Sequence, residues 1–223
     1  MGVSSATPGV GGPVEEPPSG VLSRAARRVD FDGEPLPPDA LAFLRSAAAA
    51  SGASVRFITE EAERAAVATL VAEAERVLFA DPGYRLALGS RWHPRPAEET
   101  EDHGDEESDA LLPVPDLFPG LGSFYVSTHD LADLQARRDF RLAARAPLLV
   151  VVTAPETLEG RAAALEAARR LVGAAEEAGL AACFFNQPVF APEVGRRLAG
   201  QLALDAPPQV LLAVGVPCTP RRG

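Results

Sequence analysis

Short apolar runs alternate with longer amphipathic segments in the last third of the chain. Residues 147–153, 180–185 and 209–215 are continuous apolar runs, too short for helices and rich in β-branched or aromatic side chains. Such runs are typical of strands that are covered on both faces. The segments between them, residues 155–178 and 192–204, have helical spacing and begin near a proline, which a first helical turn tolerates. The pattern predicts strand, helix, strand, helix, strand.

The earlier part of the chain contains more helix. Apolar residues at helical spacing predict helices over residues 39–50, 60–80 and 130–142. An alternating stretch, residues 55–59, predicts a strand that is exposed at Arg56. Because strands and helices alternate, we expect an α/β or α+β sandwich with helices on the sheet faces.

Two segments have too few apolar residues to join a core. Residues 1–20 are rich in glycine, proline and serine, and predict a disordered leader. Residues 94–116 hold a block of acidic side chains and predict a mobile surface loop. This loop is either a lid or a bare insertion, and its polar composition favours an insertion. The remainder, residues 21–223, is expected to form one domain.

Composition and charge exclude several classes of function. The chain has 223 residues and a formal net charge of −10, and an acidic surface repels polyphosphate, so we expect no nucleic-acid partner. The apolar runs are too short to cross a bilayer, and the N-terminus does not resemble a signal peptide. The two cysteines, Cys183 and Cys218, are expected to be reduced. These features predict a cytoplasmic protein.

The usual catalytic motifs are missing from the sequence. The three histidines, His93, His103 and His129, do not have the spacing of metal ligands. The chain has no G-x-S-x-G elbow, no Walker loop and no G-x-G-x-x-G motif after a strand. Two arginine groups remain, one at residues 24–28 and one at residues 221–222. Arginine offers a fork of donors that matches phosphate, although both groups are equally compatible with solvated surface charge.

Several stretches of the chain resemble a known family. They are FADPGYRLALGSRW (79–92), the long stretch from APLLVVV to FFNQPV (146–189), PQVLLAVG (208–215) and the final PRR (220–222), with the arginine cluster ahead of Phe31. Together they resemble the FMN-dependent nitroreductase superfamily, and more narrowly its actinobacterial branch of NAD(P)H nitroreductases. The resemblance covers roughly residues 21–222.

The resemblance implies an α+β fold, a nitroreductase-like sandwich with a central mixed β-sheet flanked by helices. It implies an oxidoreductase that transfers hydride from NAD(P)H through FMN to nitroaromatic or quinone-type acceptors, without a catalytic dyad. It also implies a homodimer with the flavin at the subunit interface. The residues that match the family's cofactor-binding positions are the phosphate-binding arginines Arg24, Arg28, Arg221 and Arg222, and the turn residues Asn186 and Gln187, whose backbone runs close to the flavin ring.

The chain also departs from the family pattern. Members of the actinobacterial branch are typically longer and contain two similar halves, and this chain resembles mainly the C-terminal half. The first arginine cluster is interrupted by Ala25 and Ala26, and the last strand ends in Ala213-Val214-Gly215 where relatives often carry an arginine. The alternative to an active reductase is therefore a catalytically weak, flavin-sequestering or degenerate member of the superfamily.

Overall fold

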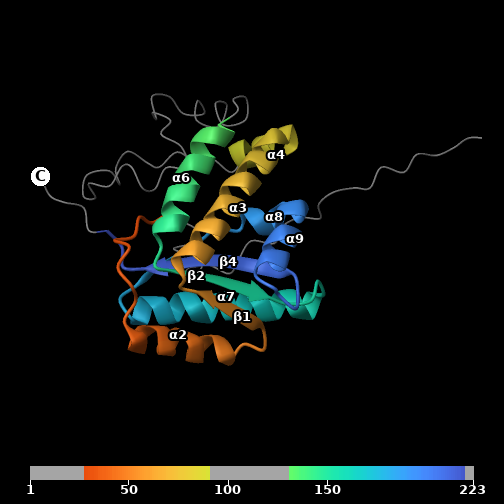
Figure 1. Cartoon of the computed structure of the whole chain (residues 1–223). Coiled ribbons are helices and arrows are strands. Elements are labelled where there is room, and N and C mark those ends of the chain that lie inside the picture. Colours follow the sequence, from red (N-terminus) through yellow and green to blue (C-terminus); the bar gives the residue numbers. More distant parts are fainter. Residues whose placement is uncertain (1–27, 91–130, 219–223) are drawn as a thin grey trace, which may run out of the picture.

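The computed structural model of the chain describes residues 28–90 and 131–218, which form one four-stranded sheet with helices on both faces (Figure 1). The strands are β1 (Ser54–Ile58), β2 (Leu148–Thr153), β3 (Ala181–Phe184) and β4 (Pro208–Gly215). The predicted α+β class is confirmed. The predicted leader and acidic loop lie outside the described residues.

The order of the strands is β1-β2-β4-β3, and each neighbouring pair is antiparallel. The expectation of a mixed sheet is therefore wrong for the described strands. The helical crossover from β2 to β3 does give these two strands the same direction, as a β-α-β unit requires. β4 then returns between them and pairs with both, so no parallel neighbours remain. The order in space thus differs from the order in sequence.

The central strands are buried on both faces, as their unbroken apolar sequences predicted. Every residue of β2 is buried, and β4 is buried from Val210 to Gly215. Alternate side chains of β2 enter two separate cores, because successive residues of a strand point to opposite faces. β1 is an edge strand, and its Arg56 is half exposed and paired with Glu63 at 2.9 Å.

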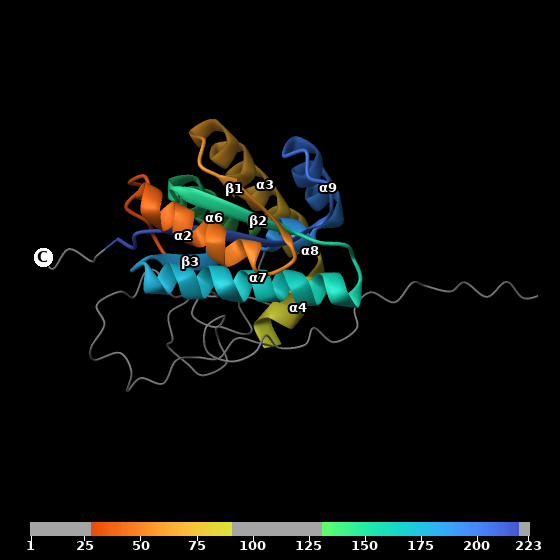
Figure 2. The same cartoon turned by 90° about the horizontal axis from the view of Figure 1, so that it is seen from below.

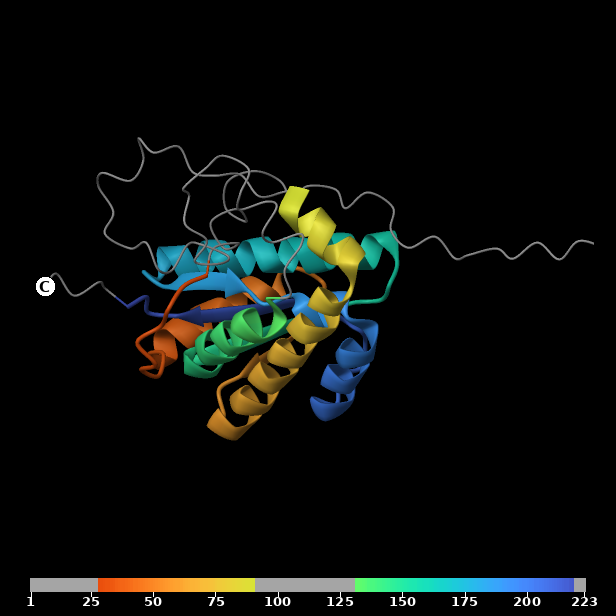
Figure 3. The same ribbon diagram turned by 90° about the horizontal axis from the view of Figure 1, so that it is seen from above.

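Each face of the sheet has its own layer of helices. One layer contains α2 (Pro38–Ala49) and α7 (Leu158–Glu177), which lie side by side (Figure 2). The other contains α3 (Glu61–Ala80), α6 (Ala132–Arg145), α8 (Gln187–Phe190) and α9 (Pro192–Gln201). α3 and α6 run together across this face (Figure 3). α4 (Pro82–Ser90) extends from the end of α3.

The ends of the helices show where local sequence signals were sufficient. After α7, Gly179 has φ +70°, the left-handed conformation in which a glycine commonly ends a helix. The start of α7 was misplaced, because Pro155 and Glu156 precede the helix and Thr157 caps it by accepting a hydrogen bond from Gly160 N at 3.0 Å. The sequence Asp81-Pro82-Gly83 leads into α4, with the proline in the first helical turn.

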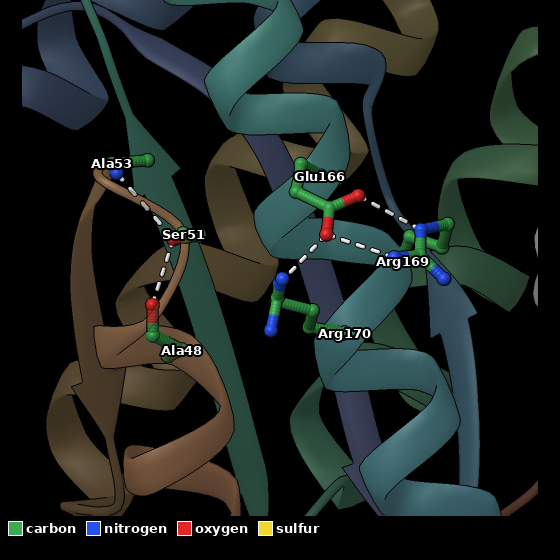
Figure 4. A network of polar contacts seen from close by, with 6 residues as sticks. All are labelled: Ala48, Ser51, Ala53, Glu166, Arg169 and Arg170. Atoms are coloured by element: carbon green, nitrogen blue, oxygen red, sulfur yellow. Dashed lines mark hydrogen bonds and ion pairs between the residues drawn. The ribbon is translucent and has the colours of Figure 1, made fainter.

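Polar contacts in the turn after α2 and along α7 are local (Figure 4). After α2, the Ser51 hydroxyl donates to Ala48 O at 2.7 Å and accepts from Ala53 N at 3.4 Å. On α7, Glu166 accepts hydrogen bonds from both Arg169 and Arg170 at 2.7–2.8 Å. These two arginines are therefore engaged with their own helix, and they do not form an unpaired basic patch.

A glycine near the start of α7 permits a close backbone approach. A Cβ at Gly160 would lie 2.1 Å from Pro155 O, a backbone atom that cannot move aside cheaply. Gly160→Ala should therefore lower the free energy of unfolding by about 1–3 kcal/mol, the usual cost of overpacking. Gly173, on the same helix, has nothing within 4 Å of such a Cβ. Gly173→Ala should raise stability by up to about 1 kcal/mol. Urea denaturation measures both, and equal effects would contradict the packing at Pro155.

Candidate functional site

The two ends of the described chain meet beside the end of β4. Asp32 N donates to Val216 O at 3.1 Å, and Cys218 N donates to Asp30 O at 2.8 Å. Phe31 and Pro217 form an antiparallel bridge between these two bonds. The two segments that flank the predicted arginine groups are thus adjacent in space. Arg24, Arg221 and Arg222 themselves lie outside the described residues.

The turn after β3 is held against β4. Phe185 N donates to Leu211 O at 2.9 Å, and Leu211 N donates to the Asn186 side-chain Oδ1 at 2.8 Å. The side chain of Asn186, a predicted site residue, therefore fixes the turn. Gln187, the next predicted site residue, begins α8 and turns its buried side chain inward. The structure shows no acceptor among the described residues for the backbone N–H of Asn186 or of Gln187.

A buried polar cluster lies directly behind this turn, with Asp139 of α6 at its centre. The Asp139 carboxylate is fully buried and accepts four hydrogen bonds. Arg28 donates two of them, at 3.0 and 2.7 Å, in a bidentate pair. Gln187 Nε2 donates at 2.7 Å, and Gln135 Nε2 donates at 3.3 Å. One carboxylate thus joins the N-terminal segment, α6 and the start of α8.

Arg28 belongs to this internal cluster. Its third contact is a 2.6 Å hydrogen bond to Phe184 O, and its guanidinium lies 4.6 Å from the centre of the Phe185 ring. Burial disfavours its charged form, but attraction to Asp139 and the hydrogen bonds between them raise its pKa. The side chain is 16% exposed. A phosphate would have to compete with Asp139 for this guanidinium, and the predicted role of Arg28 as a phosphate ligand stays a prediction.

Glu75 of α3 is the second carboxyl group of the cluster. It is 2% exposed, and burial together with the nearby Asp139 carboxylate raises its pKa to about 8. Attraction to Arg28 and a hydrogen bond with Gln187 oppose this rise only in part. Glu75 is therefore mostly protonated at neutral pH. One side-chain oxygen each of Glu75, Gln135 and Gln187 is buried without a hydrogen-bond partner in the described chain.

Reasoning from the sequence missed Glu75, Gln135 and Asp139. A signal for them was present, because each occupies a buried stripe of its helix: Glu75 is four residues after Val71, and Asp139 is four residues after Gln135. A polar residue within an apolar stripe indicates either a buried network or a misplaced stripe. Only the packing of α3 against α6 distinguishes these alternatives.

Other features of the described chain offer less chemistry. No group of His, Cys, Asp and Glu among the described residues could hold a metal ion. No described helix is long and apolar enough to cross a membrane. Cys183 and Cys218 are both free, and burial raises the pKa of the Cys183 thiol to about 11, which makes it a poor nucleophile.

An open groove of about 530 Å³ lies between α9 and the start of β4. Its charged lining residues are Glu156, Arg196 and Asp205. Arg196 is paired with Glu193 of its own helix. The groove adjoins Pro208, at the end of β4 opposite the paired chain ends, so it is separate from the polar cluster.

Comparisons with known proteins bear on the fold. No protein-family model matches the sequence, and no curated protein matches it. Among solved structures, the chain is similar to oxidized iodotyrosine deiodinase bound to FMN and 3-iodo-L-tyrosine, with a TM-score of 0.52 and 15% identity over 90% of each chain. It is also similar to a nitroreductase with bound FMN from Desulfitobacterium hafniense DCB-2, with a TM-score of 0.50 and 11% identity over 90% of this chain and 89% of that one.

A third similar structure is the hypothetical oxidoreductase YcnD from Bacillus subtilis. Its TM-score is 0.50 and its identity 12%, over 89% of this chain and 65% of that one. At such identities a likeness establishes the fold alone. The expected superfamily fold is thereby supported, while the actinobacterial branch and the resemblance to a C-terminal half stay predictions. The chain has a nitroreductase-like α+β fold.

Proposed function

We propose that this protein is an FMN-dependent oxidoreductase that takes hydride from NAD(P)H and reduces nitroaromatic or quinone-type acceptors. The observation that carries the proposal is the nitroreductase-like fold, which the chain shares with two structures solved with bound FMN. The lack of a conventional catalytic motif agrees with it, because FMN, when bound, supplies the redox chemistry and the protein supplies binding and orientation.

Two described features fit a flavin mononucleotide. The first is the turn after β3, where the adjacent backbone N–H groups of Asn186 and Gln187 are available as donors to ring oxygen or nitrogen. The second is the pairing of residues 30–32 with residues 216–218. These two segments adjoin the two arginine groups in sequence, and they are neighbours in space. We propose Arg24, Arg221 and Arg222 as the phosphate ligands, because charged, forked donors suit a phosphate dianion.

We propose further that the protein acts as a homodimer. The helices α3, α4 and α6 leave large apolar side chains exposed, namely Val77 at 49%, Leu86 at 66% and Leu134 at 51%. Exposed apolar side chains of this size on neighbouring helices are suited to burial against a second copy. A monomer in sedimentation analysis, with and without FMN, would contradict the dimer.

The first test is the absorbance spectrum of the protein after incubation with FMN and desalting. We expect about one FMN to be retained per chain. Arg24→Ala combined with Arg221→Ala should weaken FMN binding, because each charge-assisted phosphate contact contributes roughly 1.5–3 kcal/mol. As a control, Arg56→Ala with Arg197→Ala removes two cations from the surface ion pairs with Glu63 and Glu73 and should leave FMN affinity unchanged.

Turnover then separates the enzyme from the alternative. Oxidation of NADPH or NADH that depends on an added nitro compound or quinone supports the reductase. Retained flavin without such oxidation supports a flavin-sequestering protein. A folded protein that retains no flavin would contradict the proposed function.

A further inference from the structure

Side-chain hydrogen bonds from three directions fix residues 184–187. Arg28, in the N-terminal segment, donates to Phe184 O at 2.6 Å. The Asn186 carboxamide is held by Leu211 N of β4 at 2.8 Å. The Gln187 carboxamide is held by Asp139 of α6 at 2.7 Å. The end of β3 and the turn that follows it are thus tied to three separate parts of the fold, through one backbone carbonyl and two side chains.

Two of these three ties depend on one group, the Asp139 carboxylate. It binds Gln187 directly, and it holds Arg28 in the bidentate pair that directs the third guanidinium nitrogen at Phe184 O. Arg28 also lies over the Phe185 ring, 4.6 Å from its centre, so the position of Arg28 affects a second residue of this segment. Asp139 itself is fully buried, so it has no surface on which a ligand could touch it.

The composition of the cluster indicates that it orients the groups around it. Burying an ion pair and three amide or carboxyl groups contributes little net stability to a fold. Apolar side chains of the same volume would often stabilise the folded protein equally well or better. Hydrogen bonds, unlike apolar contacts, fix direction, and groups that orient a binding site through a second layer commonly affect its affinity strongly.

We propose that Asp139 is a positioning residue, which holds residues 184–187 through Gln187 and Arg28 in the conformation that receives the flavin ring. This inference rests on the proposed function. It assigns to Asp139 and Arg28 a role behind the site, in place of direct contact with the cofactor.

The test compares three variants of the full chain. Asp139→Asn keeps the shape of the side chain but removes its charge and half of its acceptors. Gln187→Met removes one donor to Asp139 within the turn. Gln135→Met removes one donor to the same carboxylate from within α6, outside the turn, and serves as the matched control. If Asp139→Asn does not fold, the pair Gln187→Met and Gln135→Met makes the same comparison.

The first readout is amide hydrogen exchange of the protein without added FMN. Asp139→Asn and Gln187→Met should speed exchange over residues 185–191 roughly tenfold, the size expected for one lost hydrogen bond to a charged group. Amides of α7 should exchange as in the wild type, and Gln135→Met should leave residues 185–191 unchanged. Equal acceleration over the whole chain, or none at the turn, would overturn the proposal.

The second readout is the affinity and midpoint potential of bound FMN. We expect the dissociation constant to rise roughly tenfold or more in Asp139→Asn, with a shifted potential and absorption band, and neither change in Gln135→Met. Unchanged FMN affinity and potential in Asp139→Asn would overturn the inference. If the wild type retains no FMN, the proposed function fails by itself, and the exchange experiment still decides whether Asp139 holds the turn.

Discussion

Replacing Asp139 with alanine should lower the free energy of unfolding by about 3–5 kcal/mol, the cost of breaking a buried ion pair from one side. The physical reason is the charge left behind: Arg28 would keep a largely buried guanidinium, 16% exposed, without its bidentate partner. Gln187 and Gln135 would each lose an acceptor as well. Urea denaturation followed by circular dichroism measures the effect.

A double variant separates the lost charge pair from lost packing. Arg28→Met with Asp139→Leu removes both charges and fills the same space with apolar side chains. Replacing a buried ion pair in this way is often neutral or stabilising. We therefore expect it to recover most of the stability that Asp139→Ala loses. A cost below about 1 kcal/mol for Asp139→Ala, the range of surface ion pairs, would mean that Arg28 and Asp139 do not form a buried pair in solution.

Glu75→Gln should make the protein more stable at pH 8 and leave its stability nearly unchanged at pH 5. The pKa of Glu75 is raised from 4.5 to about 8 in the folded protein, first by burial and then by Asp139. Between these two values the unfolded chain has lost the proton while the folded chain keeps it. The free energy of unfolding therefore falls as pH rises through this range, by about 1.4 kcal/mol per pH unit.

Glutamine cannot ionise, so the variant should lack this decline and exceed the wild type by about 2–5 kcal/mol at pH 8. Thermal or urea unfolding between pH 5 and pH 9 gives both profiles. Glu166→Gln is the control for the sign, because hydrogen bonds from Arg169 chiefly lower the pKa of Glu166 to about 2. Ionised Glu166 stabilises the folded protein at pH values above about 4.5, so Glu166→Gln should cost the same stability from pH 5 to pH 9, and this cost should disappear only as pH falls from about 4.5 toward 2. Parallel profiles for the wild type and Glu75→Gln would contradict a protonated Glu75.

The secondary structure was determined largely by local sequence. The unbroken apolar runs of β2 and β4, the helical spacing in α3 and α7, and the glycine that ends α7 each carry their signal within a few residues. Errors occurred where two local rules compete. Proline is tolerated in a first helical turn, and this rule placed the start of the helix at residue 155. Threonine is favoured as an N-terminal cap, and this rule places the start after Thr157, as observed.

The arrangement of the strands was decided only by the tertiary structure. Local sequence does not encode which strand neighbours which, because that choice depends on how the helices between strands pack. β4 lies between β2 and β3 even though it comes last in the chain, and its pairing with both makes the sheet antiparallel. The meeting of residues 30–32 with 216–218 has the same cause, since it follows from the position of β4.

The role of Arg28 shows the difference most clearly. From the sequence it was one cation in a cluster, equally compatible with phosphate or with solvent. In the fold, Asp139, 111 residues away, supplies a buried carboxylate that pairs with the guanidinium and raises its pKa despite burial. Sequence alone determined which residues carry ionisable side chains and where most of the helices lie. Which charges were removed from water, and which partners they received, depended on the packing of α3, α6 and α8 against one face of the sheet.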